Sequence, residues 1–112
     1  MAENKLADMS TEFAIQTLKL TENIKGHYSL SNQLERSGTS IGANIREAKC
    51  AHSRPDFIAK LQIALKECSE SEYWLELLIE SGYYGDQSIL DQCIEIKRLL
   101  VSSINTAKRN QN

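Results

Sequence analysis

Turn-forming residues are scarce in this chain of 112 residues, which contains one proline and five glycines. All-β folds need such residues at their many turns, so the scarcity favours helices over a sandwich or a barrel. No apolar run approaches the roughly 20 residues that a membrane-spanning helix needs. The first residues also lack the basic and then apolar layout of a signal peptide. The sequence therefore predicts a cytoplasmic protein without a membrane partner.

Histidine and cysteine, two residue types common in metal sites and in catalysis, are few as well. His27 and His52 lack the Glu-x-x-His spacing of di-iron bundles, and the three cysteines contain no C-x-x-C pair. No Gly-rich phosphate loop, G-x-S-x-G elbow or H-E-x-x-H pattern is present. We therefore expect no cofactor, no bound metal and no small-molecule substrate.

Neither sign of charge is in large excess, since 13 Lys and Arg face 15 Asp and Glu, for a net charge of −2. This balance argues against a surface devoted to phosphates. Local basic groups remain, and the last four named below should gather at one end of the molecule if the final helix runs that far. A solvated helix end that suits the helix dipole is the alternative. The candidate RNA or DNA contacts are Arg46, Lys49, Arg54, Lys97, Arg98, Lys108 and Arg109.

Apolar residues recur at helical spacing in four segments. We expect helices over about residues 5–25, from an N-cap at Ser29 or Ser31 to about residue 48, over 55–81 and over 88–108. Gly26 and Gly82 should end the first and third helices, and Pro55 suits a first turn. Helices of about 20 residues with short loops predict a single all-α domain over residues 1–112, an antiparallel up-down-up-down four-helix bundle.

The second helix carries a polar stripe beside its apolar one. Solvated helix faces are usually rich in Lys and Glu, whereas this stripe mixes amide, guanidinium, hydroxyl and carboxylate groups. Such a mixture suits a hydrogen-bonded contact between packed surfaces. The stripe consists of Gln33, Arg36, Ser40, Asn44 and Glu47.

A second row lies on the third helix, where Lys60, Glu67 and Trp74 follow one another at intervals of seven residues. Heptad spacing and a tryptophan without an evident partner favour a helix–helix contact, and a solvated Lys–Glu face with one aromatic residue on it is the alternative. Apolar residues outside the main stripes also suggest self-association. They are Ile15, Ile63, Trp74 and Leu99.

Glu72 falls within the apolar stripe of the third helix, and a buried carboxylate must be paired or protonated. We expect Arg36 as its partner, with a tyrosine hydroxyl or Lys60 as substitutes. A structural ion pair is favoured over a catalytic acid. An enzyme that uses Glu47, Glu67 or Glu72 for acid–base chemistry lacks a second catalytic group in the sequence.

Several of these motifs together resemble a known family. They are QLERSGTSIGANIREA at 33–48, SRPDFIAKL at 53–61, ALKE at 64–67 and EYWLELL at 72–78. In order and separation they resemble the four-helix-bundle family of 23S rRNA intervening-sequence proteins, over about residues 33–84. The resemblance implies a homopentameric ring without enzymatic activity. The family's recurring polar positions fall on Gln33, Arg36, Ser40, Asn44, Glu47, Lys60, Glu67 and Glu72.

That family is also similar to the accessory protein of diversity-generating retroelements, which partners a reverse transcriptase and binds nucleic acid. Those relatives present a strongly basic surface, whereas this chain is slightly acidic. The first functional hypothesis is a non-enzymatic interaction or scaffold protein that forms a ring-like homo-oligomer. The alternative is an RNA- or DNA-binding accessory subunit of a nucleic-acid enzyme such as a reverse transcriptase.

Overall fold

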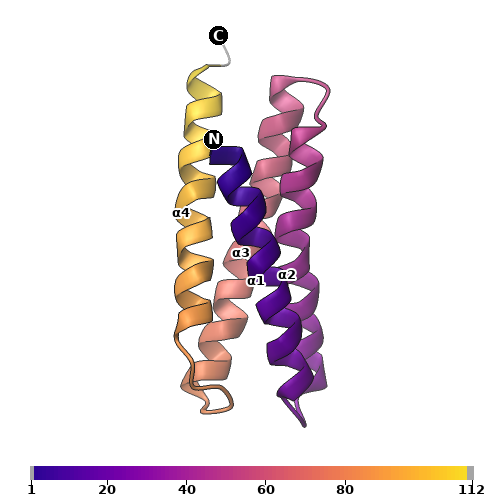
Figure 1. Cartoon of the computed structure of the whole chain (residues 1–112), viewed down its shortest axis with the longest axis vertical. Helices are drawn as coiled ribbons and strands as arrows, with labels where there is room; N and C mark the ends of the chain where they lie inside the picture. The colour runs from indigo at the N-terminus through magenta and orange to yellow at the C-terminus, as the bar shows by residue number, and fades with distance from the viewer. Residues whose placement is uncertain (1, 111–112) are drawn as a thin grey trace.

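The computed structural model describes residues 2–110 of the chain. Its four helices are α1 (Ala2–Asn23), α2 (Tyr28–Lys49), α3 (Arg54–Glu80) and α4 (Ser88–Arg109). Each helix runs opposite to the one before it, and α1 and α3 each pack against both α2 and α4 (Figure 1). The fold is therefore an all-α, antiparallel up-down-up-down four-helix bundle, as the sequence predicts.

Turn residues act at the helix ends as expected. Gly26 and Gly82 have φ angles of +91° and +85°, a region that residues with a side chain rarely adopt. At the start of α3 the Ser53 hydroxyl accepts a hydrogen bond of 3.2 Å from the backbone N–H of Asp56, and Pro55 lies in the first turn. These short, specific ends bring successive helices back alongside each other.

The start of α2 differs from the expectation that Ser29 or Ser31 begins the helix. The helix starts at Tyr28, and His27 occupies the capping position without a side-chain hydrogen bond. The Ser31 hydroxyl is buried and has no hydrogen-bond partner among the described residues. Neither serine caps α2, because the left-handed turn at Gly26 directs the chain into the helix earlier.

One stripe of each helix forms the core. Small hydroxyls enter it too, since the Ser71 hydroxyl of α3 donates a hydrogen bond of 2.8 Å to the Ser37 hydroxyl of α2. Within residues 2–110, none of the helices contains an apolar stretch that could span a bilayer. The largest fully buried side chains are Phe13, Leu6, Leu34, Ile41, Ile45, Leu61, Leu75, Leu78, Ile96 and Leu100.

Two glycines of α2 allow a close approach to α1. A Cβ atom at Gly38 would lie 3.0 Å from Cγ2 and 3.1 Å from Oγ1 of Thr17, which is fully buried. A Cβ atom at Gly42 would lie 3.2 Å from the hydroxyl of Ser10, which is also buried. Any larger residue at these positions must displace α1 or distort a core side chain.

We expect Gly38→Ala to lower the free energy of unfolding by about 1–2 kcal/mol, although alanine is the better helix former, because the buried Thr17 cannot move away. Urea unfolding followed by circular dichroism measures the change. The matched control is Gly85→Ala, where the new Cβ meets nothing within 4 Å. Adding Thr17→Ser to Gly38→Ala removes the Cγ2 atom and should recover part of the loss. A Gly38→Ala protein as stable as the wild type would contradict this account.

Candidate functional site

The polar residues predicted on α2 and α3 meet along the outer edge of these two helices. Arg36 and Glu67 form an ion pair across it, with 3.0 Å between Nη1 and Oε2. Because the helices are antiparallel, residues that follow Arg36 on its face lie opposite residues that precede Glu67. We call this surface the polar seam. It consists of Gln33, Arg36, Ser40, Asn44, Glu47, Lys60, Glu67 and Trp74.

Arg36 binds two carboxylates of α3 at once. Besides Glu67, its Nη2 atom lies 2.7 Å from Oε2 of Glu70. The side chain of Glu67 is only 12% exposed, whereas that of Arg36 is 51% exposed. The hydrogen bond to Glu70 and the charge of Glu67 raise the pKa of Arg36 above its ordinary value. This cluster joins α2 to α3 in one register and fills the middle of the polar seam. The polar rows predicted from the sequence do not include Glu70, although it lies three residues after Glu67 on the same face.

The predicted pair of Arg36 with Glu72 is wrong. Glu72 follows Glu67 by five residues, which turns its side chain about 140° around the helix, away from α2. Its carboxylate instead accepts a hydrogen bond of 2.6 Å from the ammonium of Lys97 on α4. That bond raises the pKa of Lys97. Glu72 is therefore half of a partly buried ion pair between α3 and α4, outside the polar seam.

Two further polar side chains of the seam, Ser40 and Asn44, are held within α2 itself. The Ser40 hydroxyl donates to the carbonyl of Arg36 at 2.7 Å, and the Asn44 amide donates to the carbonyl of Ser40 at 2.9 Å. Among the described residues, the side chains at the ends of the polar seam make no hydrogen bond. These three are Gln33, Glu47 and Lys60. The seam thus combines a fixed centre with unpartnered polar groups at its ends.

Trp74 gives the polar seam an apolar component. The side chain is half-buried and lies against Tyr73, with 5.2 Å between the ring centroids. Its indole N–H is enclosed without an acceptor among the described residues. Ile63, which is 42% exposed, lies on the same face of α3 eleven residues earlier. An aromatic and an aliphatic side chain thus flank the Arg36 cluster on the surface.

The candidate catalytic carboxylates do not converge. Glu67 binds Arg36, Glu72 binds Lys97, and Glu47 is exposed near the far end of α2. In the described part of the chain, no three His, Cys, Asp or Glu side chains gather as a metal-binding group. The structure therefore offers contacts between surfaces more readily than it offers acid–base chemistry.

The buried thiols of Cys68 and Cys93 lie 3.7 Å apart between α3 and α4. The hydrogen bond to Cys68, together with burial, raises the pKa of Cys93. The Cys68 sulfur also lies 3.3 Å from the backbone carbonyl oxygen of Cys93, and the Cys93 sulfur lies 3.4 Å from that of Cys68. Protonated, enclosed thiols of this kind fill core space and make poor nucleophiles.

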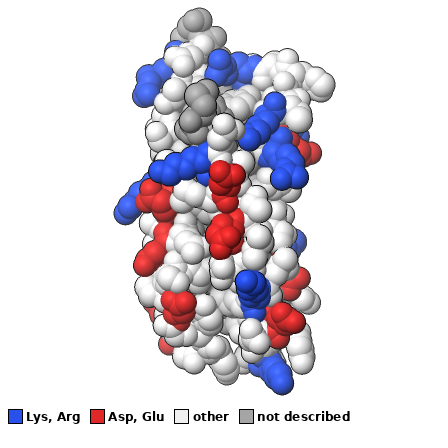
Figure 2. Space-filling view, in the orientation of Figure 1, with Lys and Arg blue, Asp and Glu red and all other residues white. Residues whose placement is uncertain are grey.

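Most of the candidate nucleic-acid contacts gather where α2 and α4 end and α3 begins, at the top in Figures 1 and 2. We call this region the basic end. Its cations form no ion pair with any described carboxylate, although the acids Glu47 and Asp56 also lie there. Arg109 donates to the Thr106 hydroxyl at 3.2 Å. The basic-end cations are Arg46, Lys49, Arg54, Lys108 and Arg109.

Lys97 and Arg98 lie elsewhere, so the prediction that all four basic residues of α4 gather at one end is wrong. The helix does reach Arg109, but its rise places Lys97 roughly 16 Å before Lys108. Lys97 binds Glu72, and Arg98 lies 3.5 Å from Glu95. These two cations are partly neutralised in the middle of α4.

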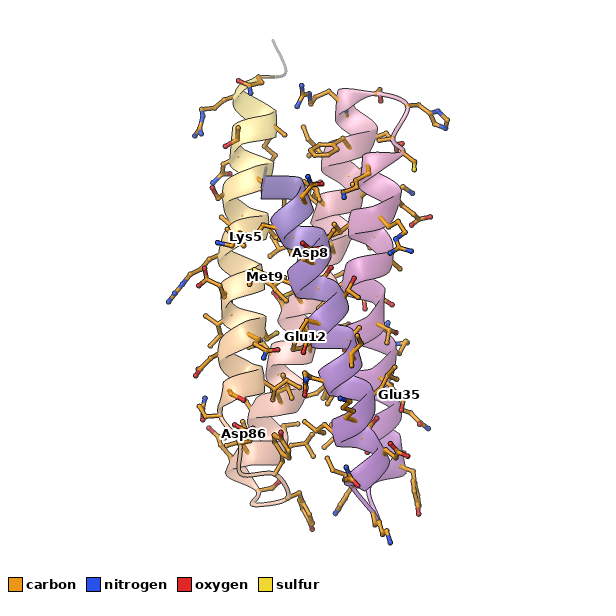
Figure 3. All side chains as sticks on the ribbon, viewed as in Figure 1. Lys5, Asp8, Met9, Glu12, Glu35 and Asp86 are labelled. Carbon is orange, nitrogen blue, oxygen red and sulfur yellow. The ribbon has the colours of Figure 1, made fainter. Side chains whose placement is uncertain are left out.

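The opposite end of the bundle, where α1 meets α2 and α3 meets α4, is mainly acidic. Asp86 marks its α3–α4 loop, and Glu35 lies on the lower half of α2 (Figure 3). On the face shown in Figure 2, blue side chains crowd the top and red ones dominate below. A small net charge thus conceals a separation of charge along the molecule. The acids near the lower end include Glu22, Glu76, Glu80, Asp86 and Asp91.

We expect Arg36→Met to lower the free energy of unfolding, because the nearly buried Glu67 loses its partner. Removing the carboxylate as well, with Glu67→Gln, should recover most of this loss. Chemical unfolding of the single and double variants gives the coupling energy. In Arg98→Met, an exposed pair is broken and stability should change little. Simple additivity of the Arg36 and Glu67 effects would show that the two residues are not coupled.

Comparison with known proteins agrees with this architecture. No curated protein matches the chain. A crystal structure of a protein of unknown function, from the S23 ribosomal protein family of Bacteroides thetaiotaomicron VPI-5482, is 49% identical. The match covers 94% of this chain and 99% of that chain, with a TM-score of 0.87. The family model of the 23S rRNA-intervening sequence protein matches residues 2–102, which include α1 and most of α4. The chain therefore belongs to the family of 23S rRNA-intervening sequence proteins.

Proposed function

We propose that this protein is a non-enzymatic cytoplasmic scaffold whose copies assemble into a ring, of five members as the family resemblance implies, through the polar seam. One observation carries the proposal. A single face combines an ordered centre, Arg36 with Glu67 and Glu70, with polar ends that have no hydrogen-bond partner among the described residues. Ordered side chains lose little entropy on association, and unpartnered ones can gain hydrogen bonds from a neighbour.

The composition of the face fits an interface between proteins. Aromatic residues and arginine are enriched at such interfaces, and Trp74 and Arg36 lie within one surface strip here. Ile63 adds exposed apolar area beside them. Each central charge already has a partner within the chain, and the one negative charge that two carboxylates and one guanidinium leave over can be met by a cation of the neighbour.

A closed ring needs a second and different surface on each copy, because its contacts are heterologous. The outer face of α1 is a candidate. Ile15 and Leu18 are exposed there by 42% and 47%, although both are large apolar side chains. Pairing the polar seam of one copy with this face of the next would cover both.

We expect Trp74→Ala to lower the mass of the assembly while helix content stays nearly unchanged, because the seam loses its largest apolar contact. Light scattering during gel filtration measures the mass, and circular dichroism measures the helix content. Ile63→Glu, at an exposed position, should have the same effect without disturbing the core. Tyr28→Ala, which removes an aromatic ring that is 70% exposed outside the seam, is the matched control. A mass unchanged in both seam variants would count against the seam.

A second candidate function is an RNA- or DNA-binding accessory subunit, for example of a reverse transcriptase. The separation of charge along the bundle favours it. The basic end carries cations that no described carboxylate neutralises, and phosphate contacts are made by such groups. Lys97 and Arg98 should contribute less, because each lies beside a glutamate of the same chain.

We expect the double variant Lys49→Gln and Arg54→Gln to weaken binding of a labelled RNA and to reduce its dependence on salt by roughly two released counterions. Fluorescence anisotropy between about 50 and 200 mM salt measures both quantities. The variant Lys19→Gln and Lys25→Gln changes the net charge equally at the opposite end and should bind like the wild type. Equal affinities of the two double variants would remove the basic end from any RNA contact.

A further inference from the structure

The first helix does not reach the basic end. In Figure 1 the first turn of α1 lies below the last turn of α4 and below the loop between α2 and α3. Two hollows lie in the space above it, of about 520 and 190 Å³. Both are lined by Arg54 and Phe57. We call this region the notch, and Phe57 with its neighbours Ala48 and Ala107 forms its apolar floor.

Phe57 presents an aromatic surface within the notch. The side chain packs against the edge of the core and is only half-buried. Hollows border it on both sides, so part of the ring is reachable from solvent. Small residues surround it, since Ala51 lines one hollow and Ser103 the other. A flat apolar group can therefore approach the ring without displacing a large side chain.

Cations surround this floor. The ammonium of Lys49 donates to the Asn4 side-chain oxygen at 3.2 Å, which holds it at the edge of the larger hollow. Arg54 makes no hydrogen bond or ion pair with a described side chain. The carboxylate of Asp56 is nearby but accepts the backbone N–H of His52 at 3.3 Å.

Arg54 is not placed there by helix stability. It is the first residue of α3, where the helix dipole disfavours a positive charge. Lys49, by contrast, lies at the end of α2, where the dipole favours it. An unpaired arginine beside an accessible aromatic ring, at an unfavourable helix position, fits a group that binds an external anion.

We infer that the notch binds single-stranded nucleic acid, with one base stacked on Phe57 and the flanking phosphates on Lys49 and Arg54. The inference rests on the second candidate function and specifies its substrate class. Aromatic rings stack on bases of any sequence, and basic side chains follow the backbone of a single strand. Bases inside a duplex already stack on one another, so a duplex can use the cations but not Phe57.

The test uses a short RNA that contains one 2-aminopurine, as a single strand and as a duplex with its complement. Anisotropy of an end label gives the affinity, and the emission of 2-aminopurine reports stacking. We expect the wild type to prefer the single strand and to quench its emission. Phe57→Leu keeps apolar volume but removes the ring, so it should bind the single strand about tenfold more weakly and the duplex unchanged. Tyr28→Leu, at the opposite end of the bundle, is the matched control.

The outcomes distinguish the notch inference from the second candidate function on which it rests. If the wild type binds neither form of the RNA, nor a DNA strand of the same sequence, the notch and the second candidate function both fall. If it binds both forms equally, and Phe57→Leu changes neither affinity nor emission, the notch falls and the candidate function stands. Circular dichroism verifies that Phe57→Leu keeps its helices. The double variant Lys49→Gln and Arg54→Gln is an independent test, because it should weaken the binding of both the single strand and the duplex.

Discussion

The close packing of α2 between α1 and α3 is the constraint on which the other features depend. On one side Gly38 admits Thr17 of α1, and on the other Ser37 receives a hydrogen bond from Ser71 of α3. Neither contact tolerates a slip along the helix, because a shift would bring a larger residue against Thr17 and separate the hydroxyls. That register places Arg36 opposite Glu67, and so decides which side chains share the polar seam.

The elements could be predicted because their causes are local. Periodicity predicts four helices, Gly26 and Gly82 end α1 and α3, and Pro55 lies in the first turn of α3. The partners of charged residues were harder to predict. Helical spacing states which residues share a face, but which neighbour covers that face depends on how the bundle is wound. Glu72 was therefore paired with the wrong helix, and its contact with Lys97 became evident only in three dimensions.

The distribution of charge over the surface is also hard to predict from the sequence. Composition alone gives a nearly neutral, slightly acidic chain, which argues against a phosphate-binding surface. Antiparallel folding then brings segments distant in sequence to one end, where Lys49 and Arg54 meet Lys108. The helix dipoles of α2 and α4 favour cations at the ends of these helices, so helix stability alone accounts for part of this cluster. Arg54 is the exception, and it lines both hollows of the notch.

A ring built through the polar seam would gather the separated charges of all its copies. Cyclic symmetry relates all copies by rotation about one axis, and such a rotation cannot invert one bundle relative to the next. Bundles aligned with the axis would therefore present every basic end on one rim and every acidic end on the other. Several weak phosphate sites on one rim would act together on a single nucleic-acid strand, which raises affinity without any new contact. In such a ring, assembly would strengthen nucleic-acid binding, because it would place several notches on one rim.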